Sequence, residues 1–324
     1  MGSAGVDGVR LTARPDGRVS SPLHGIDAAA QVLTVEATRD LTALYEPPAT
    51  SRRVSMDQLV DVLETEHRVQ AAHDTVARVS ILGPVAVEAP GQVDDDRREL
   101  LTEIACFLAL HPVGVHANRI SAAIWPRGVD ETLRASALGQ LSAWFGATAD
   151  GHPVVEQDAG IWRLAPGAVD VDWATFRAAL NRASEDGANR ETHLRAALDL
   201  VTGPAFADVP AGRFGWLESL TVEGDIAIAV NLTVQAVAEA AAARDDEVAA
   251  RSALTQGLTM LPASEELWRS RLRLAAHFGE RSDVEAVADE MYAAVAEHGA
   301  FGGTTGETDA LVDELAPGHR ARVA

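Results

Sequence analysis

Lysine is absent from this chain, so arginine supplies all 27 of its Lys-plus-Arg residues. Without lysine the protein has neither a Schiff-base amine nor the lysine of a phosphate-binding loop, which excludes two large classes of catalytic mechanism. Aspartate and glutamate together number 48, and the formal net charge is −21 at pH 7. A chain this acidic has no general attraction for nucleic acid or for an anionic membrane.

Cysteine is almost as scarce, because Cys106 is the only one. Neither an internal disulfide nor a cysteine-based zinc site can therefore form. Cys106 lies in the apolar run Ile104–Leu108, which favours a small buried core residue over a nucleophile. Aromatic residues make up 5% of the chain although 47% of its residues are hydrophobic. That combination is typical of helices rich in alanine, valine and leucine, and the length suits two or three domains.

Targeting and catalytic signals are missing as well. The printed chain has no secretory signal and no run of about 18 apolar residues. We therefore expect a cytoplasmic protein, or the soluble part of a longer chain, without membrane contact. No Gly-x-Gly-x-x-Gly, Gly-x-Ser-x-Gly or His-Glu-x-x-His motif occurs, and His67 and His73 would lie on different faces of a helix. We expect no catalytic residue, no metal site and no cofactor.

Residues 1–53 predict a small accessory αβ segment. Val9–Thr12 and Arg18–Ser20 flank Pro15-Asp16-Gly17, and Asp-Gly tolerates the backbone of a tight hairpin turn. Residues 54–77 are expected to be a linker helix. The further elements predicted here are a strand at Ala30–Val35, a short helix at Arg39–Tyr45, a linker at Pro47–Ser51 and an amphipathic helix at Met56–Ala72.

Residues 78–168 have the element order of a winged helix. A strand broken by Gly83-Pro84 comes first, and Asp94–Asp96 supply negative charge that suits the start of a helix. Helices are then predicted at Arg97–Leu110, Ala117–Ile124 and Asp130–Phe145, and the two strands of a wing at Val154–Gln157 and Ile161–Leu164. The core residues expected in the second half of this region are Trp125, Leu133, Leu138, Leu141, Trp144 and Phe145.

The rest of the chain predicts helices almost throughout. Gly203-Pro204 stops one of them, since proline cannot continue a helix. Two positions of similar sequence, Asp246 and Ser282, are 282 − 246 = 36 residues apart, near the roughly 34-residue period of tetratricopeptide repeats. A glycine-rich flexible tail is expected over residues 300–324, in which Asp309–Leu315 either adds one terminal helical turn or remains loose. The helices are predicted at Trp173–Ser184, Arg190–Val201, Phe214–Ala243 (as one helix or as two with a break near Gly224), Glu247–Leu261, Glu265–His277 and Ser282–Glu297.

Three segments of this half together resemble the bacterial transcriptional activator domain. They are the alternating run Val169–Asp172, the pattern of Leu198, Thr202, Gly203, Pro204, Phe206, Val209 and Pro210, and the triplet Trp216–Glu218. The family typically joins a winged-helix DNA-binding domain to a tetratricopeptide-like helical domain, as in the antibiotic-pathway activators of the SARP class. The resemblance implies a mainly α fold. Its parts are a winged-helix-like α/β domain at 78–168, a helical array at 169–299 and a small αβ segment before them.

Charge limits how far this resemblance extends to DNA binding. In a helix-turn-helix reader the second helix enters the major groove, which here is Asp130–Phe145. The candidate DNA-binding residues are Arg127, Arg134 and Gln140, and Arg134 is the only cation of that helix. Residues 78–168 hold seven arginines and eleven acids, a net charge of −4. Because duplex binders neutralise several phosphates, roughly 6–10 in well-studied cases, we expect weak or lost DNA binding.

Protein recognition by the helical array is the leading functional hypothesis. Paired helices of this kind stack and leave a concave surface that holds a peptide or protein. Arg269 and Arg273 share one helix face and are candidate partner-binding residues, either for an acidic segment or simply as partners of Glu265 and Glu266. The chain is thus predicted to be a non-enzymatic, transcriptional-regulator-like protein. The alternative is a working DNA-binding activator whose helical domain dimerises or activates, and both hypotheses leave room for a homodimer.

Overall fold

The computed structural model describes residues 5–6, 9–10, 12–13, 18–21, 26–29, 75–299 and 303–320. The chain divides into two compact units, Met1–Val54 and Ser55–Ala324. In the first unit β1 (Gly5–Val6) pairs with β2 (Val9–Arg10), and β3 (Thr12–Ala13), β4 (Arg18–Ser21) and β5 (Ile26–Ala29) form an antiparallel sheet. Thr12 lies opposite Ser20, as expected for a hairpin around Asp16-Gly17. The elements predicted between residues 30 and 72 lie outside the described residues.

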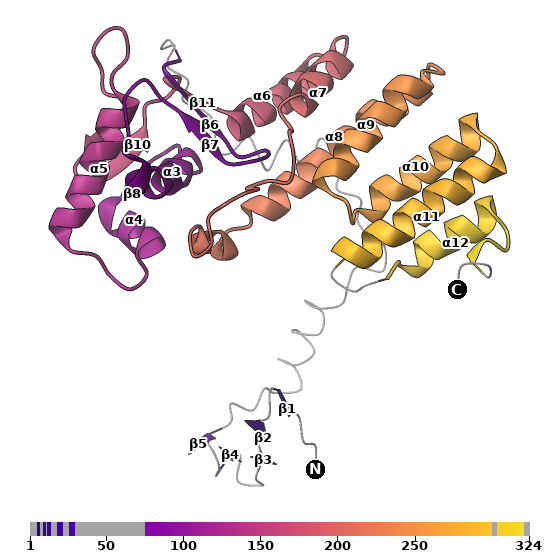
Figure 1. Cartoon of the computed structure of the whole chain (residues 1–324), viewed down its shortest axis with the longest axis horizontal. Helices are drawn as coiled ribbons and strands as arrows, with labels where there is room; N and C mark the ends of the chain where they lie inside the picture. The colour runs from indigo at the N-terminus through magenta and orange to yellow at the C-terminus, as the bar shows by residue number, and fades with distance from the viewer. Residues whose placement is uncertain are drawn as a thin grey trace. The chain divides into compact units, whose positions relative to one another are not determined.

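In the second unit, the described residues from 75 to 164 form three helices and five short strands (Figure 1). A buried stripe on α3, including Leu101, Ile104 and Leu108, packs against α4 and α5. Asp130 caps α5, because its carboxylate accepts a hydrogen bond from the Thr132 amide at 2.8 Å. The elements are β6 (Ala77–Ser80), β7 (Ala86–Glu88), α3 (Asp95–Ala109), β8 (Val115–His116), α4 (Ala117–Ile124), α5 (Glu131–Phe145), β9 (Val155–Asp158) and β10 (Ile161–Leu164).

Two three-stranded sheets complete this region. β9 and β10 form the wing, and β8 adds to the other side of β10. In the second sheet β6 is central, antiparallel to β7 and parallel to β11 (Val169–Val171). β11 leads directly into the first helix of the array. A strand of the helical half therefore completes a sheet that begins the winged-helix half.

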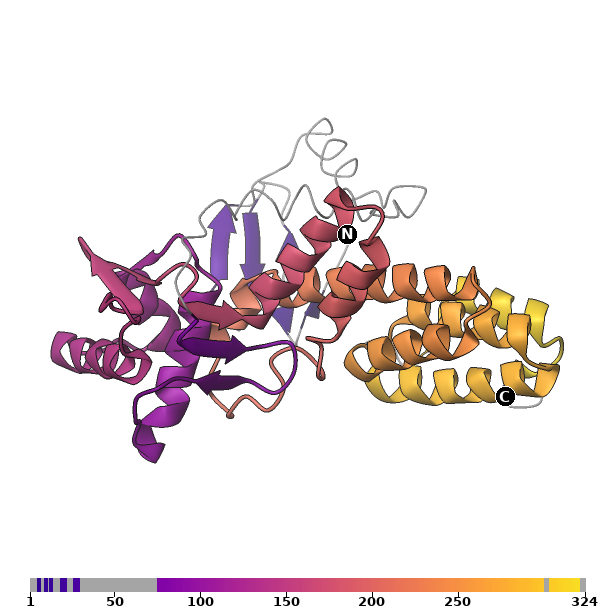
Figure 2. The same cartoon turned by 90° about the horizontal axis from the view of Figure 1, so that it is seen from above.

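The remaining helices form a row of antiparallel pairs (Figure 2). α8 packs against α7 and α9, and α10 packs against α8, α9, α11 and α12. α9 and α11 begin 281 − 247 = 34 residues apart, as in a tetratricopeptide-like array. The elements are α6 (Asp172–Glu185), α7 (Arg190–Leu198), the 3₁₀-helix η2 (Gly215–Ser219), α8 (Val222–Ala242), α9 (Glu247–Met260), α10 (Glu265–Phe278), α11 (Arg281–His298) and α12 (Gly306–Leu315). The prediction of a mainly helical fold with small sheets toward the N-terminus is confirmed.

Helix α8 is apolar around most of its circumference because it is central. Among the described residues it is the one helix long and apolar enough to cross a membrane. Ile226, Val230 and Val234 are nevertheless fully buried between neighbouring helices. A helix that is apolar on several sides is what the middle of a helical array requires.

Four predictions from the sequence differ from the structure. Leu133 is 61% exposed and outside the core, because the buried side of α5 runs through Ala137, Leu141 and Trp144. Trp125 is only partly buried, although it does pack against the core. The helix break lies at Leu220-Thr221, where η2 ends in extended backbone, and Gly224 is inside α8.

The predicted flexible tail is the fourth difference. Residues 306–315 form α12, and the described tail residues extend to Arg320. Val312 and Ala316 are fully buried against α10 and α11. His319 is also buried, and its Nε2 lies 2.8 Å from the Asp289 carboxylate. The glycines before α12 gave no sign of this packing, because short apolar contacts with distant helices leave little periodic signal.

Candidate functional site

The exposed face of α5 carries neutral side chains where a DNA reader carries cations. Thr132, Ser136 and Gln140 are exposed, and Arg134 is the only basic residue of the helix. Arg134 is turned toward α4, where its Nη1 donates to Asn118 Oδ1 and Ser121 Oγ, each at 3.3 Å. Its Nη2 lies 3.6 Å from the Glu131 carboxylate, and 21% of the side chain is exposed. Arg134 therefore ties α5 to α4.

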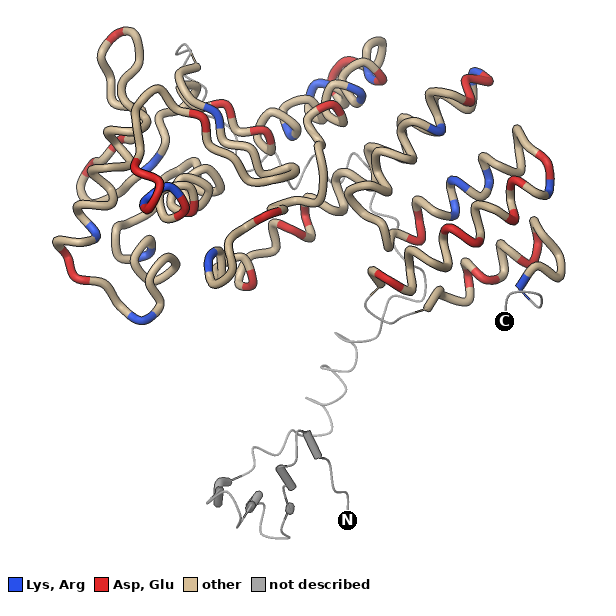
Figure 3. Tube along the Cα trace, in the orientation of Figure 1, with Lys and Arg blue, Asp and Glu red and all other residues tan. Residues whose placement is uncertain are grey.

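Two other arginines near this face are exposed. Arg127 lies in the loop between α4 and α5, and Arg119 lies in the first turn of α4. Figure 3 shows how thinly basic residues are spread over this half of the unit, with acidic positions between them. The sequence pattern alone did not single out Arg119. The position of Arg119 in α4 could have identified it as a candidate phosphate contact, because the helix before the recognition helix crosses the phosphate backbone in helix-turn-helix proteins.

The wing adds no free positive charge. Arg163 on β10 lies 2.6 Å from the Glu156 carboxylate of β9, so the one cation of this hairpin is paired across the strands. Asp158 is exposed at the tip and Ile161 is 38% exposed. A wing of this composition is poorly suited to a phosphate backbone.

The two candidate partner-binding arginines of α10 have different surroundings. Arg269 Nη1 donates to Thr308 Oγ1 of α12 at 2.9 Å, and only 12% of the side chain is exposed. Acids from both helices lie near it, Glu266 at 3.8 Å and Glu307 at 3.7 Å. Arg273 is exposed. The structure thus makes Arg269 part of the α10–α12 packing and leaves Arg273 on the surface.

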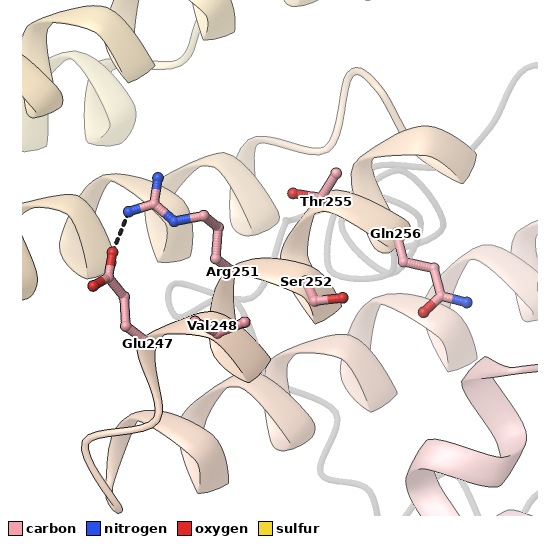
Figure 4. A pocket seen from close by; sticks show the side chains of 6 residues that line it. All are labelled: Glu247, Val248, Arg251, Ser252, Thr255 and Gln256. Atoms are coloured by element: carbon pink, nitrogen blue, oxygen red, sulfur yellow. Dashed lines mark hydrogen bonds and ion pairs between the residues drawn. The ribbon is translucent and has the colours of Figure 1, made fainter.

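The surface of the array has a shallow pocket along α9, close to α7. The residues that line it all belong to α9, and Figure 4 shows them along one side of that helix. Val248 is 80% exposed there, and Arg251 forms an ion pair with Glu247. Gln256 is held in place, since its amide donates to the Leu198 carbonyl of α7 at 2.7 Å. The other lining residues are Ser252 and Thr255.

The described residues contain no cluster of three or more histidine, cysteine or acidic side chains that could hold a metal ion. His67 and His73 lie outside the described residues. Cys106 is fully buried, as the apolar run around it predicts. Burial raises the pKa of its thiol far above the usual range, and Asp172 and Glu103 raise it further. The thiolate required of a nucleophile is therefore strongly disfavoured.

The comparison that identifies the family falls on the helical half. A family model described as the bacterial transcriptional activator domain matches residues 171–300. Residues 171–300 are therefore similar to a bacterial transcriptional activator domain. The match starts at the end of β11 and includes every helix from α6 to α11. The resemblance noted from the sequence is thereby confirmed, and transcription regulation is the general role of this family.

A solved structure shares the fold beyond this domain. The chain is similar to EmbR of Mycobacterium tuberculosis, solved in complex with a low-affinity phosphopeptide, with 19% sequence identity and a TM-score of 0.51. The similarity covers 77% of this chain and 66% of EmbR. No curated protein matches the sequence.

Proposed function

We propose that this bacterial transcriptional activator domain protein acts mainly by binding a protein partner through its helical array. Its winged helix binds DNA weakly or not at all. The protein is proposed to be non-enzymatic and cytoplasmic and to use no cofactor. A homodimer is compatible with this role.

The observation that carries the proposal is the small number of unpaired cations near the exposed face of α5. Arg134 is engaged with α4 and Glu131, Arg163 with Glu156, and Gln140 is uncharged. This leaves Arg119 and Arg127 as the exposed cations near the reading face among the described residues. Two or three cations are far fewer than the roughly 6–10 phosphate contacts of a typical duplex binder. Gln140 can still hydrogen-bond a base edge, but that contact gives selectivity rather than affinity.

The partner surface proposed is the part of α10 around Arg273. Arg273 is exposed, and an acidic partner segment would gain about 0.2–1 kcal/mol from each such exposed ion pair. Partner choice would then depend on shape more than on charge. EmbR, a neighbour in fold, was solved in complex with a phosphopeptide, and a peptide or protein is the class of ligand proposed here. Arg269 contributes indirectly, by holding α12 against α10.

The decisive experiment is a duplex selection followed by fluorescence anisotropy with the full chain. A random-sequence duplex pool at low salt should enrich no site, and the dissociation constant at physiological salt should be no tighter than about 1 μM. A nanomolar complex with one duplex that is weakened by Arg127→Ala or by Gln140→Ala would overturn the proposal.

The partner surface has a separate test. Partners captured from the native cell extract by the full chain are identified and then purified. Their affinity is measured for the wild-type protein, Arg273→Glu and the control Arg97→Glu, whose side chain is 48% exposed on α3. Weaker binding with Arg273→Glu alone supports the α10 surface. Equal affinities would exclude Arg273 as a contact.

The second candidate function is a working DNA-binding activator. The order of α3, α4, α5 and the β9–β10 wing supports it, since these are the parts of a winged-helix reader. In that case a second copy or a partner would supply the missing positive charge. The same anisotropy experiment repeated with the purified partner separates this function from the first.

A further inference from the structure

The winged-helix half and the helical half interlock at the hairpin of β6 and β7. Residues 81–85, which join the two strands, lie against residues 202–207 of the array. Ile81 and Leu82 are fully buried there. Four backbone hydrogen bonds of 2.8–3.0 Å cross this contact, from Thr202 N to Leu82 O, from Phe206 N to Ile81 O, from Ala207 N to Gly83 O and from Val85 N to Ala207 O.

Gly83 shows how close the approach is. A Cβ added at Gly83 would lie 2.0 Å from Thr202 Oγ1 and 3.3 Å from the backbone nitrogen of Gly203. Any side chain at position 83 would therefore collide with the array unless Thr202 moved. Thr202 and Gly203 belong to the segment by which the sequence resembles its family, so part of that motif is shaped to receive the hairpin.

Asp172 reaches from the array into the winged-helix half. It is the first residue of α6, and its carboxylate oxygen Oδ2 accepts hydrogen bonds from the amides of Ile81 and Leu82, both at 2.8 Å. The other oxygen accepts from the Trp173 amide at 2.7 Å. The residue is 8% exposed, and burial raises the pKa of its carboxyl group. Three donors thus replace the water that a carboxylate loses on burial.

Glu103 makes the reciprocal contact from α3 into the array. Its Oε1 accepts from the Phe214 amide at 2.8 Å and from Trp216 Nε1 at 3.2 Å, and its Oε2 accepts from Arg213 at 3.1 Å. The Glu103 side chain is 3% exposed. Phe214 has a left-handed backbone (φ 59°), a conformation that a bulky residue keeps only when its surroundings impose it. Phe107 of α3 adds an edge-to-face contact with Trp216 at 5.2 Å.

The chain that connects the two halves is also fixed by hydrogen bonds. β11 follows Ala168 at once, and it pairs in parallel with β6 along its whole length. The carbonyl of Ala168 accepts from the amides of Val76 and Ala77, at 2.8 and 3.3 Å. Two domains can rotate relative to each other when a free linker joins them and few contacts cross their boundary. Here no free linker separates the halves, and many contacts cross the boundary.

We infer that the winged helix and the helical array are one rigid body, in which Glu103 and Asp172 are the positioning residues that fix the direction of α5 relative to the array. A partner seated on the array would then lie at a constant distance from the α5 face. The inference does not depend on the proposed function, because it holds whether or not DNA is bound.

Spin-label distance measurements on the full chain test the rigidity. Val113 of the winged-helix half and Val248 of α9 are 78% and 80% exposed, so Val113→Cys and Val248→Cys provide two label sites. The natural thiol of Cys106 is fully buried and stays unlabelled. We expect one narrow distance distribution. A broad or two-peaked distribution in the otherwise wild-type protein would overturn the inference.

The role of Glu103 is tested in the same double-labelled protein. Glu103→Ala leaves the Phe214 amide and the Trp216 indole without their acceptor, and the distribution should broaden or shift. Glu99→Ala is the matched control, because Glu99 is exposed on the same helix, and it should change nothing. If Glu103→Ala fails to fold, Glu103→Gln replaces it, which keeps one oxygen as acceptor but weakens the pairing with Arg213. An unchanged distribution in a folded Glu103 variant would remove Glu103 as a positioning residue.

Discussion

The arginines of the winged helix differ in whether their guanidinium groups already form hydrogen bonds within the protein. Arg134 bridges α5 and α4, whereas Arg127 is exposed in the loop between them. The two residues look alike in the sequence because both lie near the start of the reading helix. In the structure one has a packing role, and the other has an exposed charge. Substitutions should separate these roles.

The first prediction concerns this pair. Arg134→Ala removes two hydrogen bonds to α4 and should lower the free energy of unfolding by about 1–3 kcal/mol. Arg127→Ala should leave stability within about 0.5 kcal/mol of wild type and should weaken any residual DNA binding. Urea unfolding and fluorescence anisotropy measure the two effects. If Arg127→Ala is the more destabilising variant, the assignment of these roles is wrong.

A second prediction at this scale concerns Trp144. It is 3% exposed, lies edge-to-face with Phe145 at 5.7 Å, and its carbonyl accepts from the Gly91 amide at 2.8 Å. Trp144→Ala should cost about 3–5 kcal/mol, because a large cavity would open in the core. Gln140→Ala, one turn earlier on the exposed side, is the control and should be nearly neutral. A Trp144→Ala protein with an unchanged urea midpoint would contradict the burial of this side chain.

At the scale of elements, the β6–β7 hairpin and the loop after α7 are complementary surfaces. Their fit depends on the absence of a side chain at Gly83 and on the position of Thr202. Such a pair offers a compensation experiment, because a side chain added on one surface can be matched by atoms removed from the other.

The third prediction uses this complementarity. Gly83→Ala should destabilise the protein, by about 1–3 kcal/mol for an overpacked site. Thr202→Ala removes the hydroxyl that lies 2.0 Å from the added Cβ, so the double variant should recover part of the loss. Thermal unfolding of the two single variants and the double variant gives the coupling. Strictly additive effects would mean that the two positions do not touch.

The fourth prediction concerns the contact between α7 and α8. Arg244, in the turn that follows α8, lies 2.7 Å from Glu191 of α7, and Arg195 lies 2.9 Å from the same carboxylate. Their hydrogen bonds, that from Arg244 first, lower the pKa of Glu191. A carboxylate with a lowered pKa contributes stability above its unfolded-state pKa, about 4.3, and loses it as the pH falls through the folded-state value.

Acid titration of stability tests this contact. The wild-type protein should lose stability between about pH 5 and the lowered pKa of Glu191. Glu191→Gln should lack that part of the loss and be the less stable protein at pH 7. Glu185→Gln, on the exposed side of α6, should keep the wild-type profile. Identical profiles for wild type and Glu191→Gln, measured by urea unfolding at each pH, would rule out the contribution.

At the scale of the whole molecule, net charge and local charge act together on DNA binding. The chain carries a formal charge of −21, and residues near α5 add few free cations. Acidic surroundings repel a duplex at long range, and salt screens that repulsion. The affinity of any DNA complex of this protein should therefore fall less steeply with salt than the affinity of an ordinary winged-helix DNA-binding protein.

The fifth prediction is the slope of that dependence. Arg119 and Arg127 are the exposed arginines near the reading face, and Arg134 would add a third phosphate contact only by leaving α4 and Glu131. At about 0.9 per phosphate the slope of log K against log salt should be no steeper than roughly −3, against roughly −5 to −9 for 6–10 contacts. Anisotropy titrations from low to physiological salt measure it. A slope steeper than −5 would show a basic surface supplied by a second copy or by residues outside α4 and α5.

Much of this architecture follows from local sequence alone. The period of apolar residues predicts α4 at its observed limits and the other helices from α3 to α11 to within a few residues, except for the start of α8. The motif from Val169 to Glu218 predicts the family. Charge counts predict the scarcity of cations on α5, since they need no coordinates. These features depend on neighbours a few positions apart, which is the range over which periodicity and composition report.

The tertiary structure decided how the surfaces are used. The sequence places Arg134, Arg269 and Arg273 equally well on outward faces, and only the packing of α4 and α12 shows which of them are engaged. Glu103 reads as a solvated acid on an amphipathic helix, yet it is buried against a loop more than a hundred residues away. The packing of α12 and the contact of the β6–β7 hairpin with the array were not predicted, for the same reason. Their stability comes from contacts between distant segments, and such contacts leave no pattern in either segment by itself.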